Sequence, residues 1–158
     1  AIVKGLPVFT SETHGMAQRG GTVISHRMVR DFASPLIIPG QADGLIALKA
    51  ENLLHHHGYL QPGAWAAVNH PTPVQIPAGF QQCCLDADRM AAESGDTRSL
   101  NLIMLGFALA CARNGRFGDS QLFCTLADVA AVVEKRLKGK PARLQAALRT
   151  LEISGNAV

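Results

Sequence analysis

Residues 44–69 read GLIALKAENLLHHHGYLQPGAWAAVN and contain the pattern that decides the fold class. The stretch opens with an apolar run at 44–48, continues with a helix-forming segment at 50–57, and closes with a second apolar run at 65–69. A short run that is apolar at nearly every position is typical of a strand buried on both faces of a sheet. Gly58 is suited to end the helix. Two buried strands joined through a helix predict an α/β fold.

Two further strands are predicted ahead of this unit, at residues 7–13 and 22–29. In the second, Val23, Ser25 and Arg27 alternate with Ile24, His26 and Met28, which is the period of a strand with two different faces. The two strands should be neighbours in the sheet. After residue 69, prolines interrupt the chain, and 82–85 is another strand candidate, followed by a short helix at 86–93.

The last third of the chain predicts helices. Residues 100–113 are apolar on nearly every side, as in a helix packed between other elements. The next helix is predicted from one apolar stripe, with Asp119 or Ser120 as its cap and Gly139 at its end; the stripe consists of Leu122, Phe123, Leu126, Val129, Ala130, Val133 and Leu137. Pro141 is placed to open a final helix. The prediction for residues 1–158 is a single three-layer α/β/α domain with a mixed, mostly parallel sheet and C-terminal helices.

Composition restricts the class of protein. The 158 residues are 47% hydrophobic and 17% charged, the balance of one compact domain with a core. The net charge of +3 includes a modest basic cluster at residues 135–143, which is more typical of a solvated helix end than of a nucleic-acid-binding face. The first ten residues lack the apolar core of a signal peptide, and the apolar stretch 102–112 is too short to span a bilayer. We therefore expect a cytoplasmic protein that binds neither membrane nor nucleic acid.

The cysteines and clustered histidines do not predict a metal site. Cys83 and Cys84 are adjacent and should point to opposite faces of a strand, whereas Cys111 and Cys124 fall in apolar segments expected to be helical. No pair has the two-residue spacing of zinc or iron–sulfur ligands. The three histidines at 55–57 would point about 100° apart on a helix, so they cannot converge on one ion, and a solvated helix end is expected there.

The string Glu12-Thr-His-Gly-Met-Ala-Gln-Arg-Gly-Gly-Thr-Val-Ile-Ser-His26 resembles the signature of the gamma-type domain of 2-oxoacid:ferredoxin oxidoreductases. Its His-Gly-Met-Ala-Gln-Arg-Gly-Gly core is most similar to the indolepyruvate branch, in its smaller, beta subunit. Matches continue through residues 34–37, 39–43 and 45–54 to the segment 140–147, so the resemblance covers nearly the whole chain. One difference is that family members begin with a strand and a glycine-rich turn about two dozen residues ahead of this string, and residues 1–158 do not contain that piece.

The resemblance implies an enzyme that oxidatively decarboxylates a 2-oxoacid, such as an aryl pyruvate, to an acyl-coenzyme A thioester and reduces ferredoxin, as in anaerobic metabolism. It also implies that thiamine diphosphate, Mg²⁺ and 4Fe-4S clusters belong to a larger partner subunit, with no cofactor in this chain. Coenzyme A and ferredoxin would then be encountered through the complex. Indolepyruvate and other aryl pyruvates lead as substrates, whereas pyruvate and branched-chain oxoacids stay open.

The signature string supplies the main candidate site. Gly20 and Gly21 permit a close approach of another chain, and the planar guanidinium of Arg19 suits a carboxylate, a phosphate or backbone carbonyls. We expect a partner and active-site contact formed by His14, Gln18, Arg19, Gly20 and Gly21. The alternative is a tight turn in which Arg19 pairs with Asp31 or Glu12. His14 is also a weaker candidate for a general acid or base.

Two further positions are weighed against structural roles. Asn69 and His70 end a buried strand, where α/β sheets often bind ligands, but a capping asparagine before a proline turn is equally consistent with the sequence. Asn101 begins the apolar helix that Ser99 could cap, and it is expected to need a partner in the signature loop or across an interface.

Three functional hypotheses follow from the sequence. The first is a subunit of the enzyme that carries no redox centre and is inactive when isolated. The second is a stand-alone binding or regulatory module that retains the fold without activity. The third is a subunit that only stabilises a complex. An exposed apolar patch around residues 16–21 would favour a subunit, whereas a polar surface there would favour the module.

Overall fold

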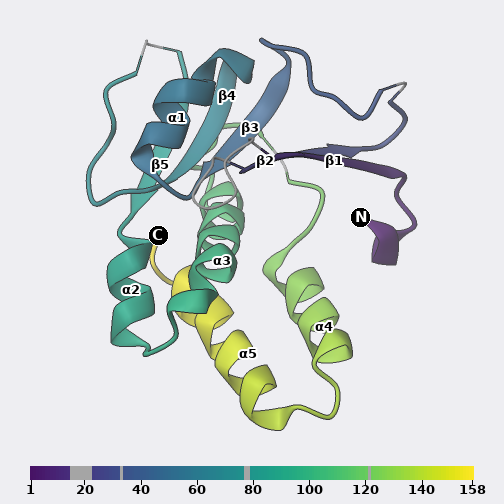
Figure 1. The fold of residues 1–158 in the computed structure, drawn as a ribbon, viewed down its shortest axis with the longest axis vertical. Coiled ribbons are helices and arrows are strands. Elements are labelled where there is room, and N and C mark those ends of the chain that lie inside the picture. Colours follow the sequence, from purple (N-terminus) through teal and green to yellow (C-terminus); the bar gives the residue numbers. More distant parts are fainter. Residues whose placement is uncertain (15–22, 33, 77–78, 121) are drawn as a thin grey trace.

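The computed structural model describes residues 1–14, 23–32, 34–76, 79–120 and 122–158 (Figure 1). At its centre, β3 (Ala42–Ala47), β4 (Leu60–Asn69) and β5 (Gln81–Leu85) form a parallel sheet in the order β3-β4-β5. Helix α1 (Ala50–His56) packs against β3 and β4, whereas α2 (Ala87–Glu93) and α3 (Leu100–Arg113) contribute to the core on the other face. The predicted three-layer α/β/α arrangement is therefore confirmed.

The residues of β4 explain why the sheet is covered on both faces. Trp65 and Ala67 belong to the apolar cluster on the α3 side, and Ala66 and Val68 belong to the cluster on the α1 side. Consecutive residues of a strand point to opposite faces, so an uninterrupted apolar run requires cover on both. The same alternation sends Cys83 and Cys84 of β5 into opposite clusters, as predicted.

A close approach within the sheet depends on Gly44. An added Cβ at this position would lie 2.0 Å from the Trp65 indole, so a side chain does not fit there without displacing the ring. The indole stacks on Phe117 with ring centroids 4.7 Å apart, and Phe117 is fully buried. Gly44 therefore gives Trp65 the space in which it closes the α3 side of the core.

The N-terminal strands β1 (Val8–His14) and β2 (Val23–Val29) pair antiparallel, which confirms that they are neighbours. The short 3₁₀ helix η1 (Ile2–Lys4) precedes them and ends at Gly5, whose φ of 67° is left-handed. Among the described strands this ribbon forms its own two-stranded sheet, separate from β3-β4-β5. The parallel and antiparallel pairings expected in one mixed sheet thus lie in two sheets, because no described strand bridges the ribbon and β3.

The C-terminal helices α4 (Leu126–Arg136) and α5 (Pro141–Gly155) extend away from the sheet beside α3 (Figure 1). Pro141 opens α5 as predicted, but the predicted start of α4 near Asp119 or Ser120 is wrong. The helix begins after Thr125, whose hydroxyl accepts a hydrogen bond from the Asp128 N–H while Asp128 accepts one from the Thr125 N–H. This reciprocal capping box fixes the first turn. Cys124 therefore precedes the helix rather than lying in it.

Two 3₁₀ turns complete the chain path, η2 (His57–Tyr59) after α1 and η3 (Thr97–Ser99) before α3. Among the helices of the described residues, none has both the length and the apolar character needed to cross a bilayer.

Candidate functional site

The signature string occupies one end of the β1–β2 ribbon. Its first residues end β1 and its last residues begin β2, with His14 in register with Val23. The predicted contact residues Gln18, Arg19, Gly20 and Gly21 lie outside the described residues, as does any pairing of Arg19. For His14 the structure gives the backbone position alone. The ribbon therefore defines where the string enters and leaves, and the contact hypothesis stays a prediction.

The outward face of the ribbon is polar. The Arg27 guanidinium donates to the Glu12 carboxylate over 3.3 Å, and the Ser25 hydroxyl donates to the same oxygen over 3.3 Å. The Arg27 and Glu12 side chains are each about half exposed. An exposed ion pair of this kind contributes little stability, so its main effect is to keep the two strands in register.

The inward face of the ribbon carries His26, which our sequence reasoning did not single out. It is the one residue within β2 that is buried, with 7% of its surface exposed. Its Nδ1 accepts a hydrogen bond from the Ile37 N–H, and its ring meets that of Tyr59 edge-on with centroids 5.6 Å apart. The signal was present in the sequence, because the alternation puts a histidine between Ile24 and Met28 on the apolar face.

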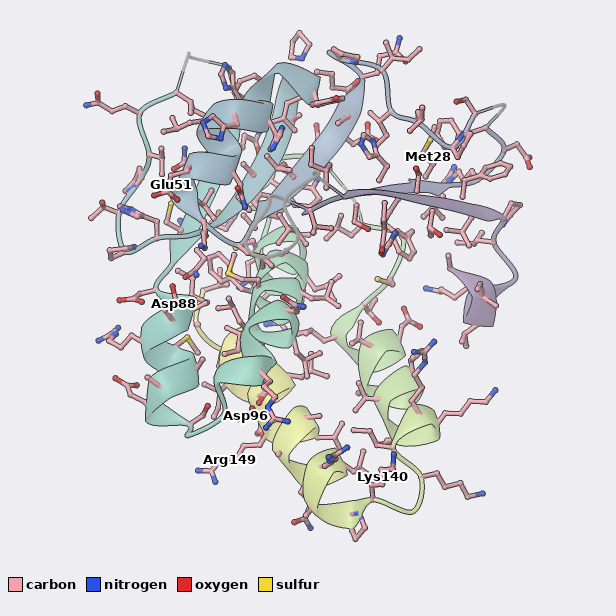
Figure 2. All side chains as sticks on the ribbon, in the orientation of Figure 1. Met28, Glu51, Asp88, Asp96, Lys140 and Arg149 are labelled. Atoms are coloured by element: carbon pink, nitrogen blue, oxygen red, sulfur yellow. The ribbon has the colours of Figure 1, made fainter. Side chains whose placement is uncertain are left out.

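Asn69 proves to be a capping residue. It is buried, its Oδ1 accepts a hydrogen bond from the Ala87 N–H at the start of α2, and its Nδ2 donates to the Leu48 carbonyl and to Asp88. The amide thus joins the carboxyl ends of β3 and β4 to α2, whose first turn carries Asp88 (Figure 2). The Nδ1 of His70 lies 2.7 Å from the Thr72 carbonyl oxygen, within the following turn. Of the two roles weighed for these residues, the capping one is confirmed.

Asn101 is exposed on the first turn of α3, so solvent can satisfy its amide without a protein partner. Asp96, just ahead of that turn, marks the end of the helix that is remote from the sheet (Figure 2). The structure therefore does not bring Asn101 to the ribbon, because α3 runs toward the sheet and its first turn lies outermost. Ser99 occupies the N-cap position, but its hydroxyl donates to the Asp96 carbonyl and does not cap the helix.

The three consecutive histidines are not equally solvated. His55 is exposed, but the Nε2 of His56 is buried with no hydrogen-bond partner among the described residues. Burial lowers the pKa of His56, and the nearby His55 and His26 lower it further. The expectation of a solvated helix end is wrong for His56, because η2 returns the chain so that the rings of His56 and Tyr59 lie 6.3 Å apart.

The described side chains do not fit a cluster or a metal–diphosphate group. All four cysteines are free, and burial raises the pKa of the Cys84, Cys111 and Cys124 thiols, which disfavours the thiolates that iron–sulfur clusters require. Within the described ranges, no group of three or more histidine, cysteine or acidic residues is placed to hold a metal ion.

A family model described as pyruvate ferredoxin/flavodoxin oxidoreductase matches residues 1–154. The chain belongs to this family. Among curated relatives, it is 44% identical over 69 residues to "Indolepyruvate oxidoreductase subunit IorB" of Archaeoglobus fulgidus, covering 44% of this chain and 34% of that one. It is 27% identical over 128 residues to the Thermococcus kodakarensis protein of the same name, covering 67% and 63%. The chain thus spans about one third to two thirds of the length of these relatives.

Solved structures of the family agree on the fold. The keto/oxoacid ferredoxin oxidoreductase gamma subunit of Geobacter sulfurreducens superposes with a TM-score of 0.70 at 17% identity, covering 98% of this chain and 80% of that one. The 2-oxoglutarate:ferredoxin oxidoreductase of Magnetococcus marinus gives 0.64 at 20% identity, covering 97% and 26%. At these identities the similarity supports the fold alone. The predicted resemblance is confirmed by the family match and by the relatives named as indolepyruvate oxidoreductase subunits.

Proposed function

We propose that this chain is the subunit without redox centres of a 2-oxoacid:ferredoxin oxidoreductase. The observation that carries the proposal is the family match over residues 1–154, together with the 44% local identity to an indolepyruvate oxidoreductase subunit. The complex would convert a 2-oxoacid and coenzyme A to an acyl-coenzyme A thioester and carbon dioxide, and pass two electrons to ferredoxin. Aryl pyruvates such as indolepyruvate are the favoured substrates.

In this proposal a larger partner subunit carries thiamine diphosphate, Mg²⁺ and the 4Fe-4S clusters. The unsuitability of the described cysteines and acidic residues for these groups supports that division. When bound, thiamine supplies the carbanion chemistry of decarboxylation, and the clusters supply the path for electrons. We place the complex in the cytoplasm, where cysteines stay reduced.

The contribution of this chain is proposed to be a contact loop formed by His14, Gln18, Arg19, Gly20 and Gly21 at the end of the ribbon. Exposed apolar side chains support a protein contact on the N-terminal part of the chain, of which Val23 adjoins the loop end of the ribbon. Of the ten large hydrophobic residues that are exposed on the described chain, seven fall within residues 2–38: Ile2, Val3, Phe9, Val23, Phe32, Leu36 and Ile38. Surfaces of this kind are typical of protein contacts. Asn101 is kept as a second contact, at a separate place on the surface.

The matched pair Arg19→Ala and Arg149→Ala tests the contact loop. Arg149 is an exposed arginine of α5, distant from the ribbon (Figure 2). If Arg19 anchors the contact, its removal should weaken binding of the partner at least about tenfold, within the range of interface arginines, and should lower turnover. Arg149→Ala should change neither. Unchanged association and turnover in Arg19→Ala would refute the loop hypothesis.

The subunit proposal itself is tested by anaerobic purification of the tagged chain from its own cells. We expect a large thiamine- and iron-containing partner to be recovered, with 2-oxoacid-dependent and coenzyme A-dependent reduction of a dye. The oxoacid that gives the highest kcat/KM identifies the branch of the family. Recovery of the chain alone and without activity would refute the proposal in favour of a stand-alone binding module.

We further propose that residues 1–158 form one gamma-type domain. Among the described strands β3 is paired on one edge, by β4, and the ribbon forms a separate sheet. No phosphate-binding role is assigned to the described residues.

A further inference from the structure

The β1–β2 ribbon needs an attachment to hold a fixed direction. A two-stranded antiparallel ribbon is only marginally stable by itself, and in the described chain this one shares no sheet hydrogen bonds with β3-β4-β5. Its outward face carries the exposed side chains of Glu12, Ser25 and Arg27, which bond to one another. Ahead of β1, Lys4 bonds to Asp128 and to the Phe123 carbonyl. On β2 itself, an attachment to the core comes from the inward face, through the buried His26.

His26 contacts two groups of the core, the Ile37 N–H and the Tyr59 ring. Its Nδ1 accepts the Ile37 N–H over 3.3 Å, and its ring packs edge-on against Tyr59 at 78° between the planes. Both Ile37 and Tyr59 pack against the apolar cluster that contains Leu53 of α1 and Val68 of β4. One buried side chain of β2 thus joins the ribbon to the segment that follows it and to the turn after α1.

We propose that His26 is a positioning residue that orients the ribbon, and with it the contact loop at residues 14–21, toward the partner subunit. This inference rests on the proposed function. His26 lies three residues after Val23, a distance of about 10 Å along a strand, so a change of the ribbon's angle at His26 moves Val23, the residue at which β2 begins. His26 is not assigned a part in the chemistry.

A histidine that merely fills space would be replaceable by any ring of similar size, whereas a positioning role requires the acceptor. His26→Phe retains a ring to pack against Tyr59 but leaves the half-buried Ile37 N–H without its partner. His26→Asn loses the ring but places Oδ1 near the position of Nδ1 and retains the acceptor. His26→Gln carries its oxygen one bond farther out, and serves as a second acceptor-loss variant should the phenylalanine variant fail to fold.

The experiment measures two quantities on the full chain: amide hydrogen exchange at Ile37 and across β1 and β2, and the Kd for the purified partner subunit. In His26→Phe and His26→Gln we expect faster exchange at these amides and a Kd raised about tenfold, the effect of losing about one hydrogen bond. In His26→Asn we expect both quantities within about threefold of the unaltered chain, a difference that corresponds to well under one hydrogen bond.

Each outcome decides a different claim. Equal affinity of all three variants and the unaltered chain would refute the positioning role alone and leave the proposed subunit function intact. Loss in the asparagine variant with no loss in the phenylalanine variant would refute the role of the acceptor and favour simple packing. If the unaltered chain binds no partner, the proposed function fails, and the positioning role fails with it.

Discussion

Substitution of Gly44 by alanine tests the packing of the central sheet. The added Cβ would lie 2.0 Å from Trp65 Cε2 and 2.3 Å from Cζ2, far inside van der Waals contact. Trp65 is only 7% exposed and is held against the fully buried Phe117, so the indole cannot move outward without losing that stack. Overpacking of a core in this way costs about 1–3 kcal/mol.

The net effect is smaller than the clash alone. Alanine restricts the unfolded chain more than glycine does, which returns roughly 0.4–1 kcal/mol where the backbone is compatible. The free energy of unfolding should therefore fall by about 1–2 kcal/mol. Urea denaturation followed by fluorescence measures it directly, since Trp65 is the single tryptophan of the chain.

Gly58→Ala is the matched control, because an added Cβ at Gly58 meets no heavy atom within 4 Å. It should leave stability unchanged or raise it by up to about 1 kcal/mol. A Gly44→Ala protein as stable as Gly58→Ala would show that the indole relaxes without loss, and would refute the packing argument.

Three further substitutions test other parts of the account. Gly106→Ala should destabilise the α3–α5 contact by about 1–3 kcal/mol, because its Cβ would lie 2.0 Å from Ser154 Oγ. In urea denaturation the double variant with Ser154→Ala should recover most of this loss, and additive losses would contradict the clash. Burial lowers the pKa of His56, so the unfolded chain binds more protons and the free energy of unfolding should fall as the pH decreases below 6.5. His56→Gln should flatten the dependence of this free energy on pH between pH 7 and pH 5, and an unchanged slope would argue against the role of His56. Hydrogen bonds from Lys4 and Thr125 lower the pKa of Asp128 to about 2, so the stability that Asp128 contributes is present above pH 3.8 and is lost as the pH falls toward 2. Asp128→Asn should lower the Tm at pH 7 and abolish that acid transition, and equal Tm values at pH 7 would count against the capping box.

The layers of the fold could be predicted from the sequence because their patterns are local. The apolar runs of β3 and β4, the fully apolar α3 and the proline at the start of α5 each specify an element without reference to distant residues. The start of α4 was predicted wrongly because the apolar stripe continues through residues 122 and 123, whereas the hydrogen bonds of Thr125 and Asp128 determine where the helix begins.

The candidate site depends on relations that a sequence pattern does not contain. Asn101 was expected to need a partner in the signature loop or across an interface, but it is exposed on the first turn of α3, where solvent can satisfy its amide. The role of His26 depends on the Ile37 backbone and on Tyr59, which lie eleven and thirty-three residues away. Periodicity could show that His26 faces the core, but not which groups it meets there. The contact role of the residues between His14 and Val23 remains a prediction.

The measurement that tests the central claim most directly is reconstitution of turnover from the separated subunits. The purified partner and this chain are assayed anaerobically, alone and mixed, for coenzyme A-dependent reduction of a dye with indolepyruvate as substrate. The account predicts that neither subunit is active alone and that activity rises with added chain until the two are equimolar. Full activity of the partner alone would reduce this chain to a structural accessory, and thiamine-dependent turnover by the isolated chain would contradict the proposed division of labour.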